Sequence, residues 1–217
     1  LIRLGKNQQR DFELGLKIAI AFHDIGKIPF SDERSFEGFY NDGSLTFTGH
    51  ELISFILLSE ASASNVISRI IDNITLEAAK YSVLLHHHPQ NIERRFKKLL
   101  KNTYDFNKSN MASGEKGRRF VVKRSSVLND LDELAKTGLI EAYVVQEFKA
   151  SLNQALSNDL DVLEIINETN IQTIDEYIKG SIILERGNEK LLNVFMPMLL
   201  SLITMDYVSA LERNKCE

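Results

Sequence analysis

The residues best suited to chemistry in this sequence are its histidines, which are few and grouped. The chain has five histidines, and they lie in three places: "HD" at residues 23–24, "GHE" at residues 49–51 and "HHH" at residues 86–88. Two of these places also have an acidic residue next to the histidine. Imidazole and carboxylate groups together bind transition-metal ions in proteins. A single histidine at any of these places is more often structural, but the grouping predicts a metal site.

The first pair follows an apolar segment, residues 12–22, whose composition predicts a largely buried helix. We expect Gly26 to end that helix in the left-handed conformation, as glycine commonly does. Asp24 does not suit this position, because a negative charge at a helix C-terminus meets the negative end of the helix dipole. A positive partner is therefore expected beside Asp24, and two remain open: the side chain of Lys27 and a bound metal cation.

Helix geometry limits how neighbouring ligands can share a metal ion. Successive residues on an α-helix point about 100° apart, because the helix has 3.6 residues per turn. Adjacent ligands therefore suit one site where the backbone leaves the helix, as Gly26 and Pro89 indicate here. A further acid would reduce the positive charge of such a site. Asp206 is the candidate, since it lies in an apolar segment where an isolated charge is costly. A salt bridge or an exposed helical position is the alternative.

The elements that must position these residues all read as helices. The expected helices cover residues 10–24, 51–59, 63–72, 75–88, 91–101, 126–137, 140–156, 159–168, 173–186 and 188–213. No strand alternation of any length and no internal repeat interrupts this pattern. The sequence therefore predicts an all-α helical bundle in which residues 1–217 form one domain.

Several residues mark where these helices begin, end or bend. Thr48 and Glu51 have the spacing of a capping box, and Thr75 is placed to cap the next helix. Gly138 is expected to end the helix that precedes it. Pro197 should kink or split the last helix, because proline removes a backbone donor and clashes with the preceding turn.

The charges are unevenly distributed along the chain. The net charge is −4, but residues 94–124 hold eleven basic and two acidic residues, so this segment carries +9 and the remainder −13. We interpret residues 90–125 as a basic, partly flexible insertion, because 102–124 is a long polar stretch without helical periodicity. A positive segment on an acidic body suits a protein that handles a polyanion.

Bulk composition restricts the class of protein. Of the 217 residues, 43% are hydrophobic and 26% are charged, as in an ordinary soluble domain. The one cysteine, Cys216, allows no disulfide within the chain, which favours a reducing, cytoplasmic setting. We expect no membrane-spanning segment, because polar residues and a proline interrupt the apolar stretch around 191–203, and no secretory signal is apparent. The chain begins with Leu1, so we expect some N-terminal sequence to be missing.

The order of these motifs resembles a known family. "FHDIGK", "GHE", "HH" and a late aspartate in "DYVSA" are similar to the motifs of the HD-domain metal-dependent phosphohydrolases. Within that family the chain most resembles the stand-alone CRISPR-associated HD nuclease, whose helicase is a separate chain. The motifs extend from residue 23 to residue 210. No phosphate-binding "GxxxxGK[ST]" loop is present, so we expect no fused helicase motor.

The resemblance implies a role for each motif residue. It implies six metal ligands, which are His23, Asp24, His50, His86, His87 and Asp206. It implies two catalytic residues: Asp24, shared by two divalent cations (Mn, Mg, Ni, Co or Fe), and Lys27, facing the scissile phosphate. "HHH" leaves two registers open, and we favour its first pair over His87 with His88. The family has one more metal-binding histidine upstream, and none precedes His23; either it lies outside this chain or one metal position is weakened.

The activity implied by the resemblance is hydrolysis of phosphodiester bonds in single-stranded DNA, internal or terminal, as the destructive step of CRISPR interference. A water activated by the two cations would attack phosphorus, with Lys27 assisting. The implied partners are single-stranded DNA, a separate CRISPR-associated helicase and an RNA-guided surveillance complex, with no membrane. The basic segment would hold the DNA backbone. The candidate contacts are Arg94, Arg95, Lys97, Lys98, Arg118 and Arg119, with Phe96, Tyr104 and Phe120 as candidate stacking partners.

Two other functions remain open from the sequence. The same site could act on small nucleotides or cyclic nucleotides, although a mononucleotide needs only a pocket and the +9 segment argues mildly against it. The chain could also be non-hydrolytic, either a di-iron oxygenase or a metal-binding adaptor that retains nucleic acid without cutting it.

Overall fold

The structure is a computed structural model, and the residues it describes are 6–30, 40–41, 44–45, 49–87, 92–112, 120–156, 158–163 and 189–213. The helices in these ranges are α1 (Lys6–Phe22), the 3-10 helix η1 (Ile25–Phe30), α3 (His50–Ala61), α4 (Ile67–Ile70), α5 (Asn73–Leu85), α6 (Ile92–Ala112), α7 (Arg124–Thr137), α8 (Ala142–Ala155) and α11 (Glu189–Arg213). Two antiparallel pairs of two-residue strands accompany them, β1 (Tyr40–Asn41) with β2 (Ser44–Leu45) and β3 (Val121–Val122) with β4 (Leu160–Asp161). The predicted all-α class is confirmed.

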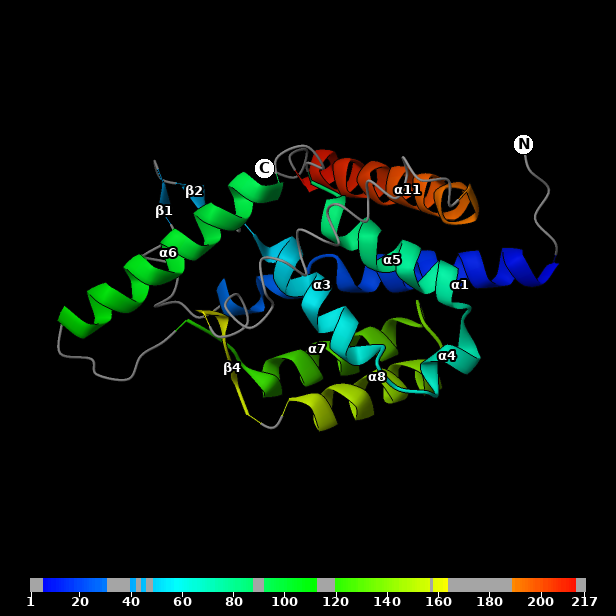
Figure 1. Ribbon diagram of the computed structural model, residues 1–217, viewed down its shortest axis with the longest axis horizontal. Helices are drawn as coiled ribbons and strands as arrows, with labels where there is room; N and C mark the ends of the chain where they lie inside the picture. The colour runs from blue at the N-terminus through cyan, green and yellow to red at the C-terminus, as the bar shows by residue number, and fades with distance from the viewer. Residues whose placement is uncertain are drawn as a thin grey trace.

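Helix α3 lies in the middle of the bundle. It packs against α5 on one side and α8 on the other, and it also contacts α1 and η1. Helix α11 lies along α5, and α7 pairs with α8 (Figure 1). The core between these helices is apolar, with fully buried side chains such as Phe22, Leu57 and Phe148. Burying a side chain of this kind contributes roughly 1.5–3 kcal/mol.

Helix α3 is buried on all sides over residues 50–58, as its almost continuously apolar sequence predicts. The buried residues include three polar ones, His50, Glu51 and Ser54. A helix surrounded by other elements is apolar all round, and any polar group on it needs a partner there. The groups that lie beside the first half of α3 must therefore provide partners for these three residues.

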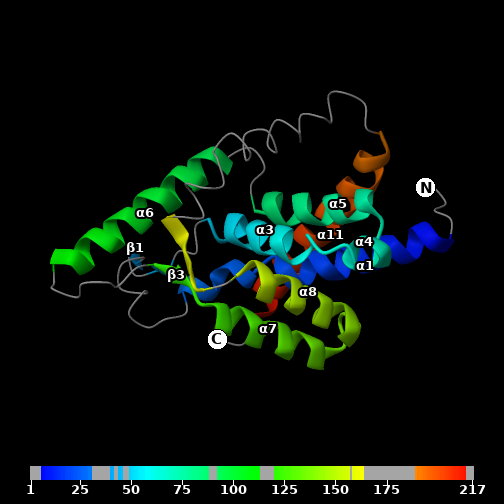
Figure 2. The ribbon, with the colours of Figure 1, turned by 60° about the horizontal axis from the view of Figure 1, so that its bottom comes forward.

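Helix α6 is longer than the sequence analysis predicted. It continues to Ala112, so the prediction of an irregular loop over residues 102–112 is wrong, while residues 113–119 lie outside the described part of the chain. The buried side of α6 includes a polar residue, Thr103. Its hydroxyl can be buried because it donates a hydrogen bond to the Leu99 carbonyl at 2.9 Å. Periodicity in apolar residues alone does not detect such a turn. Helix α6 extends beyond the rest of the bundle in both views (Figures 1 and 2).

Other element boundaries also differ from the predictions. The helix expected over 159–168 is wrong at Leu160–Asp161, which form β4 and pair with β3 from another part of the chain. The helix expected over 63–72 is reduced to α4. The helix expected over 173–186 lies outside the described residues. Strand pairing between distant segments is a tertiary contact that local sequence preference does not report.

The caps of two helices are not the predicted ones. Helix α3 begins after Gly49, which has a φ of +91° and gives no side-chain cap, while Thr48 of the predicted capping box lies outside the described residues. Helix α5 begins after Asp72, whose carboxylate accepts a hydrogen bond from the Thr75 backbone N–H at 3.0 Å, so the prediction that Thr75 caps it is wrong. Gly138 ends α7 with a φ of +69°, as predicted.

Helix α11 covers α5 and carries the last of the predicted site residues. It continues through Pro197 and is not split there. Over Glu189–Val208 it is long and apolar enough to cross a membrane, the one such helix in the described ranges. Length and composition are weak grounds for a membrane span, because a core helix passes the same test. In α11, 22% of that segment is buried: Phe195, Met198 and Leu202 are buried, whereas Leu200 and Met205 are exposed. The expectation that no segment could span a membrane is therefore not confirmed.

Candidate metal centre

The "HD" turn connects α1 to η1 and is held against α3. The Gly26 backbone N–H donates to Ser54 Oγ at 2.8 Å, and that hydroxyl donates to the His23 carbonyl at 2.9 Å. A Cβ atom on Gly26 would lie 2.0 Å from the His50 carbonyl oxygen, so only glycine allows this approach. The reason for Gly26 is thus close packing against α3 and not a left-handed stop, which the sequence analysis had wrongly expected.

Three elements bring four predicted ligands together. Asp24 lies in the turn after α1, His50 is the first residue of α3, and His86 and His87 follow the last residue of α5. Each offers one ligand atom, and these atoms all lie within 4.8 Å of one another. As the sequence analysis anticipated, neighbouring ligands occur where the backbone leaves a helix. A group of one carboxylate and three imidazoles suits a divalent transition metal.

The contacts inside this group are close. His50 Nε2 lies 3.2 Å from Asp24 Oδ1 and 3.1 Å from His87 Nε2. His86 Nδ1 lies 2.6 Å from the Val83 carbonyl, which can only accept, so Nδ1 carries the hydrogen and Nε2 keeps its lone pair. Among the described residues, His86 Nε2 is a buried atom without a hydrogen-bond partner, and buried Asp24 Oδ1 has only the contact with His50 Nε2. Buried polar atoms in this condition are costly unless they bind something, so the residues present fit a cation.

The protonation states also suit metal binding. Burial, followed by the charge of His87, lowers the pKa of His86 to about 2. Burial, followed by the charge of His50, lowers the pKa of His87 to about 4. Both imidazoles are therefore neutral at pH 7, which is the form that binds metal. Burial alone would raise the pKa of Asp24, but contacts with His50, His23 and Lys27 outweigh it and hold that pKa below its usual range.

The two oxygens of Asp24 face different partners. Oδ1 faces the histidine group, whereas Oδ2 lies 2.7 Å from Lys27 Nζ and 3.5 Å from His23 Nε2. The sequence left open whether Lys27 or a cation compensates Asp24. Lys27 contacts one oxygen, and the other lies among the imidazoles. The carboxylate can therefore interact with Lys27 and with a metal cation at the same time.

The remaining predicted ligands lie next to the group of four. The ring of His23 packs edge-on against His86 with centroids 5.4 Å apart, and its Nδ1 lies 2.7 Å from the Ile20 carbonyl. Asp206 Oδ2 on α11 lies 3.9 Å from His87 Nδ1. His86 and His87, the favoured register of the doublet, are the pair that joins the group, while His88 lies outside the described residues.

The predicted nucleic-acid residues fall into different environments. Arg94, Lys97 and Lys98 are exposed on α6, and Arg118 and Arg119 lie outside the described residues. Arg95 instead turns inward and pairs with Glu51 of α3. Of the candidate stacking residues, Tyr104 is 60% exposed. Phe96 and Phe120 are buried in the core, so their assignment to base stacking is wrong.

The buried partners of the site, Ser54 and Glu51, were not predicted from the sequence. Glu51 is 3% exposed and its Oε2 lies 3.6 Å from His50 Nδ1. Burial raises its pKa, but the hydrogen bonds and charge of Arg95 outweigh that effect, so the net direction is downward. The signal was present: a charged residue next to a histidine at the start of an otherwise apolar helix needs a buried partner.

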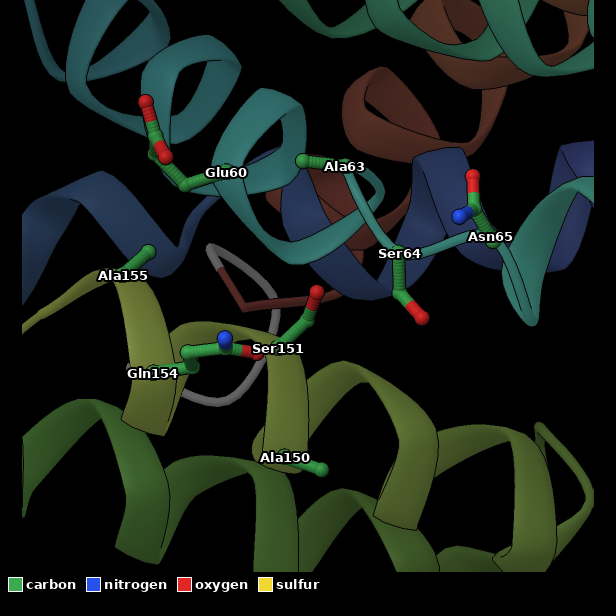
Figure 3. Close-up of a pocket in the computed structure, with 8 residues that line it drawn as sticks. All are labelled: Glu60, Ala63, Ser64, Asn65, Ala150, Ser151, Gln154 and Ala155. Carbon is green, nitrogen blue, oxygen red and sulfur yellow. The ribbon is translucent and has the colours of Figure 1, made fainter.

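A separate hollow lies at the other end of α3, about 15 Å along the helix from His50. Its volume is about 500 Å³, and it is lined by residues from the end of α3, the following loop and α8 (Figure 3): Glu60, Ala63, Ser64, Asn65, Ala150, Ser151, Gln154 and Ala155. The lining combines polar side chains with three alanines, and none of it belongs to the group of metal-ligand candidates.

Comparison with known proteins agrees with the motif order. The family model described as HD domain matches residues 3–136, which is more than half of the chain and includes Asp24, His50, His86 and His87. No curated protein matches the chain, and no solved structure does. HD domains bind divalent metals and are typically metal-dependent hydrolases of phosphate compounds. This chain belongs to the HD-domain family.

Proposed function

We propose that this HD domain is a metal-dependent nuclease that hydrolyses phosphodiester bonds of single-stranded DNA in CRISPR interference. The observation that carries the proposal is the position of a basic helix, α6, directly beside the metal-ligand group. A Cβ atom on Gly49, the residue before His50, would meet the Leu99 side chain of α6 at 2.6 Å. The start of α3 is therefore in close contact with α6.

The outer face of α6 suits a nucleic-acid strand. Its exposed basic residues follow the three- and four-residue spacing that places side chains on one face of a helix. These residues are Arg94, Lys97, Lys98, Lys101 and Lys108, with exposed Tyr104 between them. From Arg94 to Lys108 the face is about 21 Å long. A basic face with an aromatic residue favours a polymer held by its backbone, and a mononucleotide would not need such a length.

The residues around the metal position define the chemistry. A divalent cation bound there would lower the pKa of a water molecule, which can then attack the phosphorus atom. The donors for that cation are Asp24 Oδ1 and the imidazoles of His50, His86 and His87. The ammonium group of Lys27, 2.7 Å from Asp24 Oδ2, adds positive charge next to the place where a phosphate oxygen would gain negative charge.

The proposal includes a second cation, which would use the other side of Asp24. The donors there would be Asp24 Oδ2 and His23 Nε2, which lie 3.5 Å apart, and the charge of Lys27 beside the same oxygen would oppose a cation. We therefore expect one tight and one weak site for Mn²⁺, Mg²⁺, Ni²⁺, Co²⁺ or Fe²⁺. A calorimetric Mn²⁺ titration that fits two equal sites would contradict this assignment of donors.

The proposed setting follows from the same resemblance in the motifs. A separate CRISPR-associated helicase would supply the single strand, and an RNA-guided surveillance complex would select the target. Both partners, and the cytoplasmic location, are part of the proposal. The structure supports the proposal through the position of α6, whose inner side contacts the start of α3 through Leu99 and Arg95 and whose outer face is basic.

The test is cleavage of circular single-stranded DNA in the presence of Mn²⁺. A circle has no ends, so its loss requires internal cutting. We expect the unmodified protein and the control Asp132→Ala, which changes an acid on α7 away from the site, to cut the circle, and Asp24→Ala not to cut it. Hydrolysis of mononucleotides without any cutting of DNA would establish the small-nucleotide alternative instead. Retention of DNA without products, by a protein that binds Mn²⁺, would point to an adaptor.

A further inference from the structure

The buried ion pair between Glu51 and Arg95 connects α3 to α6 next to the metal-ligand group. Arg95 Nη2 donates to Glu51 Oε2 at 2.9 Å, and Arg95 Nε donates to Oε1, so the guanidinium holds both oxygens. The Glu51 side chain is 3% exposed and that of Arg95 22%. A two-pronged contact of this kind fixes geometry as well as charge.

The same carboxylate faces the outer nitrogen of His50. Glu51 Oε2 lies 3.6 Å from His50 Nδ1, while His50 Nε2 points in the other direction, toward Asp24 Oδ1 and His87. At 3.6 Å this contact is longer than a hydrogen bond, so the carboxylate acts on Nδ1 through its negative charge. That charge favours the tautomer that carries hydrogen on Nδ1, which leaves the Nε2 lone pair directed into the group of ligands. Metal-binding histidines commonly donate their second ring N–H to a carboxylate, and Glu51 is the carboxylate on that side of His50.

Stability alone is a weak explanation for this pair. Burying two charges costs about as much as their attraction returns, and well-packed apolar residues often serve a core equally well. Apart from Ser54, the other buried residues of α3 are apolar, yet Glu51 lies among them directly after His50. The position of the pair is explained if its role is to orient the histidine.

We propose that Glu51 and Arg95 are positioning residues for the metal centre: Glu51 holds the His50 ring with Nε2 toward the cation, and Arg95 holds Glu51 and ties α6 to the site. Metal binding and the placement of the basic face of α6 are then linked through one buried contact. The orienting role rests on metal binding by the four-residue group, and only the link to nucleic acid rests on the proposed nuclease function.

The first test is metal affinity without DNA. Glu51→Gln keeps the shape of the side chain and removes its charge, and Arg95→Gln removes the partner. Each should weaken Mn²⁺ binding by roughly 10- to 100-fold, the usual effect of losing such an orienting group. Arg95→Lys keeps the charge without the two-pronged contact and should fall between these variants and the unmodified protein.

A matched control separates orientation from loss of an ion pair. Lys149 of α8 pairs with Asp132 of α7 at 2.5 Å, and its side chain is 21% exposed, nearly the same as that of Arg95. Lys149→Gln should leave Mn²⁺ affinity within twofold of the unmodified protein. If Arg95→Gln and Glu51→Gln also stay within twofold while circular dichroism shows them folded, the proposal is wrong.

A second measurement needs no variant and holds even if the variants do not fold. Nitrogen-15 NMR of the unmodified protein loaded with diamagnetic Zn²⁺ reports the tautomer of each imidazole. We expect His50 to carry hydrogen on Nδ1 and to bind Zn²⁺ through Nε2. Binding through Nδ1 would overturn the proposal. If the tautomer and affinities are as expected but no DNA is cut or bound, the orienting role stands and the nuclease function and its link to α6 fail.

Discussion

Replacing Ser54 by alanine tests how firmly the "HD" turn depends on α3. Ser54 is fully buried and bridges the Gly26 N–H and the His23 carbonyl. Ser54→Ala removes both contacts and leaves the buried Gly26 N–H and the partly buried His23 carbonyl without these partners. Because each such group costs about 1–3 kcal/mol, we expect the free energy of unfolding to fall by about 3 kcal/mol. For a domain of this length that lowers the midpoint of thermal unfolding by about 6–12 °C.

Ser82 of α5 provides the control. It is also fully buried, but its hydroxyl donates at 2.8 Å to the Ala78 carbonyl, which also accepts the backbone bond of its own helix. Ser82→Ala therefore leaves no backbone group without a partner and should cost about 1 kcal/mol. Both variants are compared by urea unfolding followed by circular dichroism, with metal removed. If the two costs agree within about 0.5 kcal/mol, the Ser54 bridge does not hold the turn as we infer.

Further predictions concern pH, the glycine contact and the basic helix. The pKa of His87 is lowered to about 4 in the folded protein, so the unfolded chain binds more protons than the folded one below about pH 6.5. The stability that His87 contributes is therefore complete above about pH 6.5 and should decrease by about 2 kcal/mol between pH 7 and pH 5, measured by urea unfolding without metal. Equal stabilities of His87→Gln and the unmodified protein at both pH values would refute this. Gly26→Ala places a Cβ atom 2.0 Å from the carbonyl oxygen of His50, a predicted metal ligand. The affinity for Mn²⁺, measured by calorimetry, should therefore fall at least tenfold. An unchanged affinity would show that the turn can move to avoid the clash. Lys97→Ala should reduce the slope of log affinity against log salt concentration for single-stranded DNA by about 0.7. The control is Lys136→Ala, at an exposed position on α7, which should leave this slope unchanged.

Much of the site could be predicted because its ligands are local features of the chain. Histidine and aspartate are recognisable by type, and helix ends are marked by short-range signals, so Asp24, His50, His86 and His87 were all identified as candidate ligands from the sequence. The motif order also indicated the family that the comparison then showed. The role of Gly26 was misjudged, because a close approach to another helix leaves no trace in the local pattern.

The length of α6 and the surroundings of its neighbouring aromatic residues were harder to predict. Helix α6 was ended too early because Thr103 fills an inward position with a hydroxyl that is satisfied within its own helix. Phe96 and Phe120 were assigned to base stacking because they lie in a basic segment, and only packing shows that both belong to the core. In each case, composition described the neighbourhood along the chain and not the neighbourhood in space.

The sequence by itself determined the all-α class, the types of ligand available and their positions at helix ends, since these depend on periodicity and residue chemistry over a few residues. Only the tertiary structure decided which atoms face one another. It directs the two oxygens of Asp24 to different partners, and it joins Glu51 to Arg95 across 44 residues of chain. The reason is that such contacts depend on how separate helices pack, and packing is set by the whole core and not by any single segment.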